Sequence, residues 1–354
     1  MYFFIILTLL PSLTASTPRA CNNHPSLCNT TYDAVTHLGA HNSPYLHDAS
    51  NHFSAFGNQF FNTTTQLDAG VRLLTVQVHL VENSRTKAKV LRLCHTKCLF
   101  IDAGLLSDWL YTIRIWLDNN PNEVVTLVLV NYHWVLSHDL QAEYAKADIA
   151  HYGFVPSHPP NTNASWPTLG DMIDKGHRLV TFVNEVRREE GDRVPYLLRE
   201  WDYIWETAYD VSTPTGFTCT PDREFNTTSI ADALASKKLF FMNHLLYEHQ
   251  AFGIILPAVD AIEETNSWYA QGGLGKHLER CRREVGRKPT FVLVDYASVG
   301  PAVVAVDVMN GVRGAVGRLE LPVGRVVEGE SVGSRGRLGM GALVLAVGAS
   351  LLMV

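Results

Sequence analysis

The sequence predicts an α/β fold in which short strands alternate with helices, the order of a (β/α)8 barrel. Apolar runs of strand length recur along the chain, and stretches with helical spacing lie between them. The 354 residues, of which 46% are hydrophobic and 18% charged, provide apolar material for a large core. We therefore expect one large domain.

The expected strands are apolar runs, and several of them end in a polar side chain. The first follows Ala34 and Val35 and ends near His41, because Pro44 favours an extended conformation at Ser43 that stops the strand. The others are residues 71–79, 89–95, 124–130, 178–183, 203–205, 238–244 and 290–295. The segment 203–205 is short and poorly patterned, and it completes the count of eight.

Two helices are marked by their ends. Ser107 is an N-cap candidate, apolar residues follow at Leu110, Ile113 and Leu117, and Pro121 stops the helix. Residues 168–174 form a second helix before the strand at 178–183.

His41 is the first functional candidate, because an imidazole gives or takes a proton near neutral pH. The end of a parallel strand is also where an α/β barrel keeps its chemistry. Taken alone, a histidine beside Asn42 and Ser43 is more often a hydrogen-bonded loop residue.

Polar side chains mark other strand ends as well. In the second strand, Thr75, Gln77 and His79 are expected to face the site. The third strand ends on His95 and the last on Asp295, for which capping a turn is the alternative. Further polar residues at or near strand ends are Asn131, Glu206, Asn243 and His244. His244 is as readily explained as a hydrogen-bonded core histidine.

The start of the chain predicts export. Residues 1–20 combine a short apolar block with small residues, as a secretory signal peptide does, although the usual Lys or Arg is missing. Four glycosylation sequons, at Asn29, Asn62, Asn163 and Asn226, suit a secreted glycoprotein.

The six cysteines suit the same oxidising compartment. Their spacing favours the pairs Cys21–Cys28, Cys94–Cys98 and Cys219–Cys281, although other connectivities remain open. A metal site at Cys94 and Cys98 is the alternative, but no second pair of ligands matches it.

The end of the chain departs from the barrel pattern. We expect the domain to cover residues 21–310 and a Gly- and Arg-rich linker to cover 311–337. The uncharged apolar tail at 338–354 predicts a GPI-attachment signal, and a C-terminal transmembrane helix is the alternative.

The net charge of −6 and the pI near 6.2, without a basic stripe, argue against a nucleic-acid partner.

Three motifs carry a resemblance to a known family. In order, residues 39–43 (GAHNS), 70–74 (GVRLL) and 93–98 (LCHTKC) resemble the core of the phosphatidylinositol-specific phospholipase C X-domain superfamily. The chain is most similar to its secreted fungal branch, the PLC-like phosphodiesterases, from about Cys21 to about Asn310. The resemblance implies an irregular TIM (β/α)8 barrel.

The resemblance also implies phosphodiester cleavage. His41 would take the proton from an attacking inositol hydroxyl, His95 would protonate the leaving alcohol, and Asp295 would orient one catalytic histidine. The residues expected to bind substrate are Asn42, Arg72, Gln77, His79, Glu206 and Asn243. The expected partners are a phosphodiester, with a phosphoinositide or GPI-type lipid as candidates, and a membrane surface reached through the GPI anchor. No cofactor is expected, and the protein is expected to be a monomer.

The second strand departs from the family pattern. Bacterial members carry an Asp and an Arg there and calcium-dependent members carry acidic ligands, whereas this chain has Thr75 and Gln77. These neutral side chains ligate calcium weakly, so we expect a site without metal. Asn42 stands where bacterial members have Asp, although it matches the Asn of the calcium-dependent branch. Arg72 or Arg92 could supply the missing guanidinium, although a salt bridge under the barrel is the alternative for Arg72.

Two other functions remain open. A barrel that has lost turnover would be a non-catalytic cell-surface binding protein, which Thr75 and Gln77 favour. A barrel glycosidase would use Glu206 with Asp202 or Asp210, a pair whose separation the sequence does not give.

Overall fold

The computed structural model describes residues 18–82, 86–160, 162, 164–189, 194–223 and 229–322. The predicted signal peptide therefore falls outside the described residues except for its last three positions. The sequons at Asn163 and Asn226, most of the predicted linker and the whole apolar tail also lie outside them. Within the described residues, no helix is long and apolar enough to cross a membrane.

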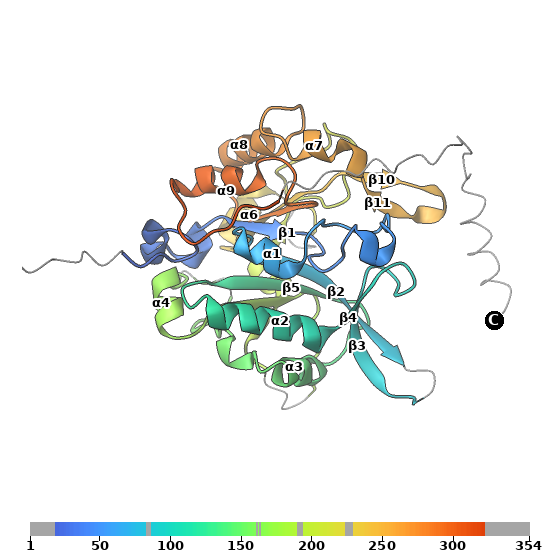
Figure 1. The fold of residues 1–354 in the computed structure, drawn as a ribbon. Coiled ribbons are helices and arrows are strands. Elements are labelled where there is room, and N and C mark those ends of the chain that lie inside the picture. The colour runs from blue at the N-terminus through green and yellow to red at the C-terminus, as the bar shows by residue number, and fades with distance from the viewer. Residues whose placement is uncertain are drawn as a thin grey trace, which may run out of the picture. The chain divides into compact units, whose positions relative to one another are not determined.

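Eight parallel strands form the main sheet, which curls into a half-barrel (Figure 1). Their spatial order is β7-β6-β5-β2-β1-β12-β9-β8. The strands are β1 (His37–Ala40), β2 (Leu73–Glu82), β5 (Val125–Asn131), β6 (Leu179–Val183), β7 (Leu197–Arg199), β8 (Ile204–Glu206), β9 (Leu239–His244) and β12 (Phe291–Val294). In the described part of the chain no ladder joins β7 to β8, so the barrel is open there. The predicted α/β barrel class is confirmed, and its irregularity lies at this gap.

One expected barrel strand is wrong. Residues 89–95 form β3 (Lys89–Cys94), which runs antiparallel to β2 and continues the sheet to β4 (Asp102–Leu105) outside the eight-strand path. Too few residues separate Glu82 from Lys89 for the crossover that a parallel strand needs. The place in the barrel is taken by β7, a three-residue strand that the sequence pattern does not reveal.

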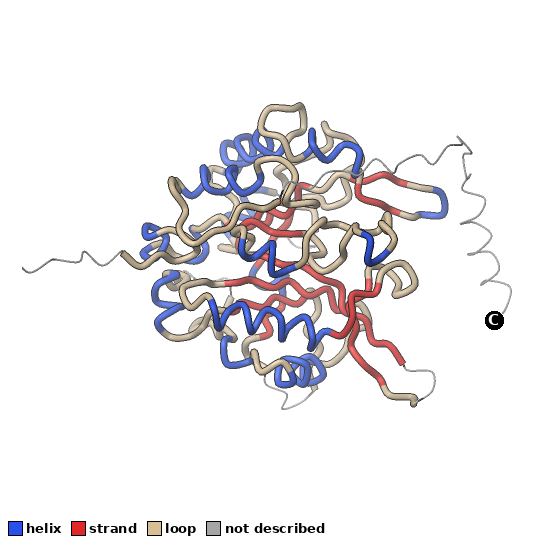
Figure 2. The backbone as a smooth tube through the Cα atoms, viewed as in Figure 1, coloured by secondary structure: helices blue, strands red, loops and turns tan. Residues whose placement is uncertain are grey.

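Helices cover the outer surface of the curled sheet and lie above and below the strands in this view (Figure 2). They are α1 (Thr63–Asp68), α2 (Leu106–Asn119), α3 (Ser137–Lys146), α4 (Leu169–Asp174), α5 (Glu200–Tyr203), α6 (Ile230–Ala235), α7 (Ile262–Thr265), α8 (Leu274–Val285) and α9 (Ala302–Asn310). Short 3-10 turns include η3 (Ala49–Asn51) and η5 (Ala251–Gly253), and the latter joins the small hairpin of β10 (Tyr247–His249) and β11 (Ile255–Pro257). The two helices expected from their ends are α2 and α4, but Ser107 is not an N-cap, because α2 begins at Leu106 with Leu105 as its N-cap.

Alternation along the strands separates the barrel interior from the layer under the helices. Leu73 packs in the interior cluster with Val128 and Phe291, whereas Leu74 and Val76 pack in the outer cluster. The interior face of β2 therefore continues from Leu73 through the polar side chains at positions 75, 77 and 79. It follows that the predicted polar positions of β2 lie at the C-terminal mouth of the barrel.

Gly39 is required by this close packing. A Cβ atom there would lie 2.6 Å from Leu73 Cδ2 and 2.9 Å from Leu293 Cδ1, too close for any other residue without movement of both leucines. The strand that carries His41 thus runs tightly between β2 and β12.

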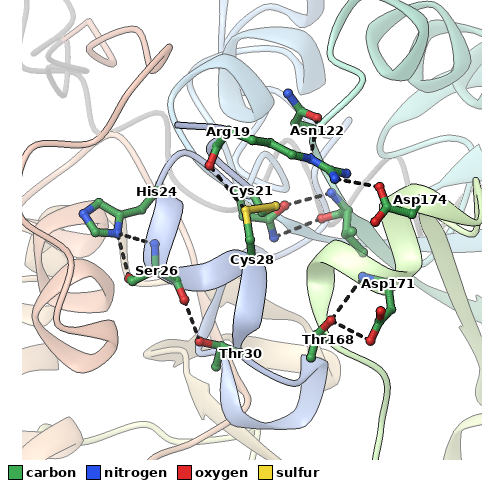
Figure 3. Close-up of a disulfide and its surroundings, with 12 residues drawn as sticks. Arg19, Cys21, His24, Ser26, Cys28, Thr30, Asn122, Thr168, Asp171 and Asp174 are labelled. Atoms are coloured by element: carbon green, nitrogen blue, oxygen red, sulfur yellow. Dashed lines mark hydrogen bonds and ion pairs between the residues drawn. A yellow bond between two sulfur atoms is a disulfide. The ribbon is translucent and has the colours of Figure 1, made fainter. Parts of the chain in front are cut away.

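Three disulfides form, and they are the pairs favoured by spacing: Cys21–Cys28, Cys94–Cys98 and Cys219–Cys281. No cysteine is left free, which removes the alternative of a metal at Cys94 and Cys98. Beside the first disulfide, Arg19 donates to Asn122 and pairs with Asp174 at 2.6 Å, so the N-terminal segment is tied to the barrel (Figure 3).

Candidate active site

His41 and Asp295 emerge side by side from neighbouring strands. Ala40 of β1 pairs with Val294 of β12, so the next residue of each strand points out of the same mouth. Nδ1 of His41 lies 2.8 Å from Oδ1 of Asp295, and Asp295 is only 2% exposed. Because a carboxylate accepts, Nδ1 carries the proton and Nε2 is left with a lone pair, the form of a general base.

Asn58, on the loop after β1, joins this pair. Its amide nitrogen donates to Asp295 Oδ1 at 2.8 Å, and its carbonyl oxygen accepts from Asn42 Nδ2 at 3.2 Å. The neighbouring Gln59 donates to the backbone oxygen of His41 at 2.9 Å. Both side chains are buried, so the loop fixes the ends of β1 and β12 from above.

Asn42 occupies a left-handed turn with φ of 48°, a conformation that asparagine tolerates better than most residues. Thr75 Oγ1 accepts from its backbone N–H at 2.8 Å. The hydroxyl of Thr75 therefore holds the turn that aims Asn42 and His41.

His95 sits in the loop closed by the Cys94–Cys98 disulfide. Its Nδ1 donates to the Phe56 carbonyl at 2.7 Å, its ring stacks parallel on Tyr45 with centroids 5.2 Å apart, and Asn42 Nδ2 lies 3.3 Å from its Nε2. Burial, as the largest influence, lowers the pKa of His95 to about 4, and nearby His41 lowers it further while the Phe56 carbonyl and Asp295 act the other way.

Gln77 serves the same loop. Its Oε1 accepts from the backbone N–H of Thr96 at 2.8 Å, and its backbone oxygen accepts from the Tyr45 hydroxyl at 2.9 Å. Gln77 therefore fixes the position of the loop that follows His95.

A second polar group lies at the ends of β8 and β9. Glu206 Oε2 accepts from Arg223 Nη1 at 3.0 Å and from Asn243 Nδ2 at 3.1 Å. Glu200 is hydrogen-bonded to Glu206, and burial followed by the charge of Glu206 raises the pKa of Glu200 well above its ordinary value. Burial and the neighbouring carboxylate therefore both favour the protonated form of Glu200.

Tyr247 connects the two groups. Its ring centroid lies 6.4 Å from that of His41, and its phenol feels the charges of both Asp295 and Arg223. The two histidines and the Glu206 group thus surround one mouth of the barrel.

Comparison with known proteins fits this architecture. A model of the PI-PLC X family (PI-PLC X 1) matches residues 27–310. The chain belongs to the PI-PLC X family. PI-PLC X domain-containing protein 1 of Arthroderma benhamiae is 34% identical over 292 residues, which cover 82% of this chain and 89% of that protein. An uncharacterized secreted protein of the same organism is 31% identical over 285 residues, 80% of this chain and 61% of that protein.

The fold also matches a solved structure. Phosphatidylinositol-specific phospholipase C from Listeria monocytogenes superposes with a TM-score of 0.52 at 16% identity, covering 81% of this chain and 96% of that chain. This likeness places the PI-PLC X domain described above among α/β barrels of the PI-PLC type.

The structure corrects the expectation that Arg72 binds substrate in this PI-PLC X domain. Its guanidinium contacts Glu123 at 2.7 Å, the Leu67 carbonyl and Asn23, all before the N-terminal ends of the strands. Arg72 is buried, so the salt bridge under the barrel is its role. Arg92 pairs with Asp102 between β3 and β4 and offers no substitute either.

Other predicted residues lie near strand ends without touching the histidines. His79 stacks on Tyr132 with centroids 4.3 Å apart, farther along the interior face of β2. Asn131 holds the loop after β5 through the backbone of Val135. His244 points outward and contacts His277 at 3.0 Å, as a core histidine does.

The donor set at the mouth of this PI-PLC X domain is poorly suited to a divalent cation. Calcium and magnesium prefer several carboxylates with free oxygens. Asp295 accepts from both His41 and Asn58 through Oδ1 and keeps only Oδ2 free, and Glu206 accepts from Arg223 and Asn243, so the described mouth does not offer several free carboxylates.

Sequence reasoning missed Asn58, Gln59, Arg223 and Tyr247. All four lie outside the eight barrel strands, three of them in irregular loops, where no periodicity marks the inward side. The Asn-rich composition of residues 51–65 was the available signal, but it does not distinguish Asn58 from its neighbours.

Proposed function

We propose that this chain is a phosphoric diester hydrolase or lyase that uses His41 as general base and His95 as proton donor to the leaving group. The observation that carries the proposal is the His41–Asp295 hydrogen bond at the barrel mouth, with His95 joined to it through Asn42 and Asn58. Family membership supports the reaction class.

The proposed chemistry uses the free nitrogen of each imidazole. His41 Nε2 removes the proton of the attacking hydroxyl, and Asp295 stabilises the imidazolium that forms. The oxygen attacks phosphorus, the P–O bond to the leaving alcohol breaks, and a proton from His95 completes the alcohol. With a neighbouring hydroxyl on the substrate the product is a cyclic phosphodiester.

Exposed apolar side chains on loops around the mouth support a phospholipid-type substrate. Leu99, Phe252, Trp134 and Phe53 are 85%, 82%, 63% and 48% exposed. Their loops follow β3, β10, β5 and β1, and the β10–β11 and β2–β3 hairpins project from the same end of the barrel (Figure 1).

The backbone at these positions strengthens the case. Phe53, Trp134 and Phe252 have φ values of 55°, 53° and 62°, in the left-handed region. Such a conformation costs a bulky residue on the order of 1 kcal/mol or more. Exposure and strain together favour contact with a lipid surface, where the aromatic rings leave water.

Secretion belongs to the same proposal. Three disulfides, the predicted signal peptide and a relative labelled as secreted support it. The apolar tail at 338–354 would act as the signal for GPI attachment, and the GPI lipid that replaces it would anchor the protein at the outer cell surface.

A substrate panel tests the function. Purified protein should release soluble phosphate esters from at least one phosphodiester lipid in mixed micelles. His41→Ala should abolish release, whereas His249→Ala, at an exposed histidine bonded to Asp210, should retain it. Equal activity of the His41 variant and wild type would refute His41 as the base.

A non-catalytic binding protein is the second candidate. It is favoured because the arginines described at the mouth are paired with carboxylates rather than free to stabilise a phosphoryl group. Arg199 pairs with Glu185 and Asp202, and Arg223 pairs with Glu206. If inositol phosphates raise the melting temperature while no lipid in the panel is cleaved, this candidate replaces the first.

A further inference from the structure

Three side chains form a continuous hydrogen-bonded chain between the two histidines. It runs from Asp295 to Asn58 at 2.8 Å, from Asn58 to Asn42 at 3.2 Å, and from Asn42 to His95 Nε2 at 3.3 Å. Both asparagines are buried, with exposures of 0% and 3%, so water does not compete for these bonds.

The carboxylate at one end fixes the direction of every bond. Asp295 only accepts, so Asn58 must present its NH2 group to it and its carbonyl to Asn42. Asn42 must then present its own NH2 group, which faces both Asn58 and Nε2 of His95. An N–H pointing at Nε2 requires a lone pair there.

The other ring nitrogen agrees. Nδ1 of His95 lies 2.7 Å from the carbonyl oxygen of Phe56, which only accepts, so Nδ1 carries the hydrogen. The ring is therefore neutral with its proton on Nδ1. The atom needed to protonate a leaving group, Nε2, holds no proton in this arrangement.

The surroundings of His95 keep it neutral. The titratable groups around it are His41, Asp295, His79 and the phenol of Tyr45, and none of the described carboxylates touches the ring. Burial lowers the pKa of His95 to about 4. A protonated ring would place its charge against the NH2 group of Asn42.

We propose, on the basis of the phosphodiesterase function above, that Asn42 and Asn58 are positioning residues that hold His95 as a proton acceptor in the resting site. His95 becomes the acid only when an anionic phosphodiester occupies the mouth and supplies the negative charge that Asn42 lacks. His95 then takes a proton from solvent on Nε2 and passes it to the leaving oxygen. His41 releases to solvent the proton it took from the attacking hydroxyl, so protons balance over the cycle.

Nitrogen NMR of 15N-histidine-labelled protein tests this without turnover, with the signals of His95 identified by their loss in His95→Gln. At pH 7 we expect His95 to be neutral, protonated on Nδ1, and to remain so down to about pH 5. A proton on Nε2, or an imidazolium at pH 7, would overturn the proposal.

Two variants at Asn42 separate charge from structure. Asn42→Asp places an acceptor at Nε2 and should raise the pKa of His95 by roughly 1 to 3 units. Asn42→Ala removes the amide without adding charge and should not reproduce that rise. Equal pKa values in the two variants would contradict the proposed direction of the chain.

Inorganic phosphate tests the second half. At a concentration that shifts the His41 signals to saturation, phosphate should raise the pKa of His95 by at least one unit. If phosphate saturates His41 and leaves His95 unchanged, substrate does not charge His95. If the spectra agree but no lipid is cleaved, the proposed function fails while the resting protonation stands.

Discussion

Replacing Asp295 by asparagine should slow the reaction without loosening the fold. The amide keeps an oxygen that accepts from His41 and Asn58, and Oδ2 of Asp295 has no hydrogen-bond partner that an NH2 group would displace. What disappears is the negative charge beside His41. The effect should therefore fall on the state in which His41 is an imidazolium.

The size of the effect follows from the geometry. His41 Nδ1 and Asp295 Oδ1 are 2.8 Å apart, and the delocalised charges are centred at about 4 Å, which gives about 4 kcal/mol at an effective dielectric constant near 20. That corresponds to a fall in kcat of about 10³-fold. KM should change little, because the charge acts after substrate binds.

The assay is initial rate against the lipid that the panel identifies. Asp174→Asn is the matched control, since it removes a carboxylate paired with Arg19 at the opposite end of the barrel. A fall of less than tenfold in Asp295→Asn, or an equal fall in the control, would refute the role of Asp295. The double variant with His41→Ala should be no slower than His41→Ala alone, because the two residues act as a unit.

Other outcomes follow from the described contacts. Arg72→Met should lower the free energy of unfolding by about 3 to 5 kcal/mol in denaturant titrations, because it leaves the buried carboxylate of Glu123 without its partner, and KM should not change. A raised KM with unchanged stability would instead indicate that Arg72 binds substrate. Burial lowers the pKa of His37 to about 4, so as pH falls the unfolded state binds a proton before the folded state does, and the free energy of unfolding decreases below about pH 6.5. Relative to His37→Phe, the wild type should lose about 2 kcal/mol of unfolding free energy between pH 8 and pH 5. Parallel curves of unfolding free energy against pH for the two proteins would contradict this. The double variant Trp134→Ser, Phe252→Ser should bind zwitterionic vesicles at least tenfold more weakly in a sedimentation assay, while its kcat on a soluble ester stays constant. Unchanged sedimentation would show that Trp134 and Phe252 do not contact lipid. EDTA should leave activity intact. If EDTA removed the activity and added calcium restored it, the expectation of a site without metal would be wrong.

The barrel was predictable where strands are long and alternate. The interior face of β2 carries Leu73, Thr75 and Gln77 at every second position, so their direction follows from periodicity. The positions of His41 and Asp295 at neighbouring strand ends were likewise predictable, because each directly follows an apolar run. These positions depend on local sequence alone.

The errors arose where nonlocal pairing decides. β3 has the pattern of a barrel strand but pairs antiparallel, since its short connection to β2 leaves no alternative. β7 has only three residues and is defined by its pairing with β6. In the sequence, Arg72 cannot be told apart from an arginine that binds phosphate, and only the fold shows that Glu123 lies beside it.

Asn58 shows the same limit within the site. Its partner Asp295 lies 237 positions away in sequence, and its loop has no repeating pattern. The amide contributes through the direction of its hydrogen bonds, which depends on the acceptor it meets. Residues of this kind emerge only when the strand ends are brought together.

The charges at the mouth explain why the two histidines differ. Glu206 is paired with Arg223, and burial raises the pKa of Glu200 well above its ordinary value, so little unpaired negative charge is expected on this side of the mouth. The carboxylate of Asp295 accepts directly from Nδ1 of His41 and leaves Nε2 of that ring free to take a proton. His95 meets the same carboxylate only through two amides, and each amide turns an N–H toward the next group. One carboxylate thus makes His41 ready to take a proton and leaves His95 dependent on the charge that the substrate brings.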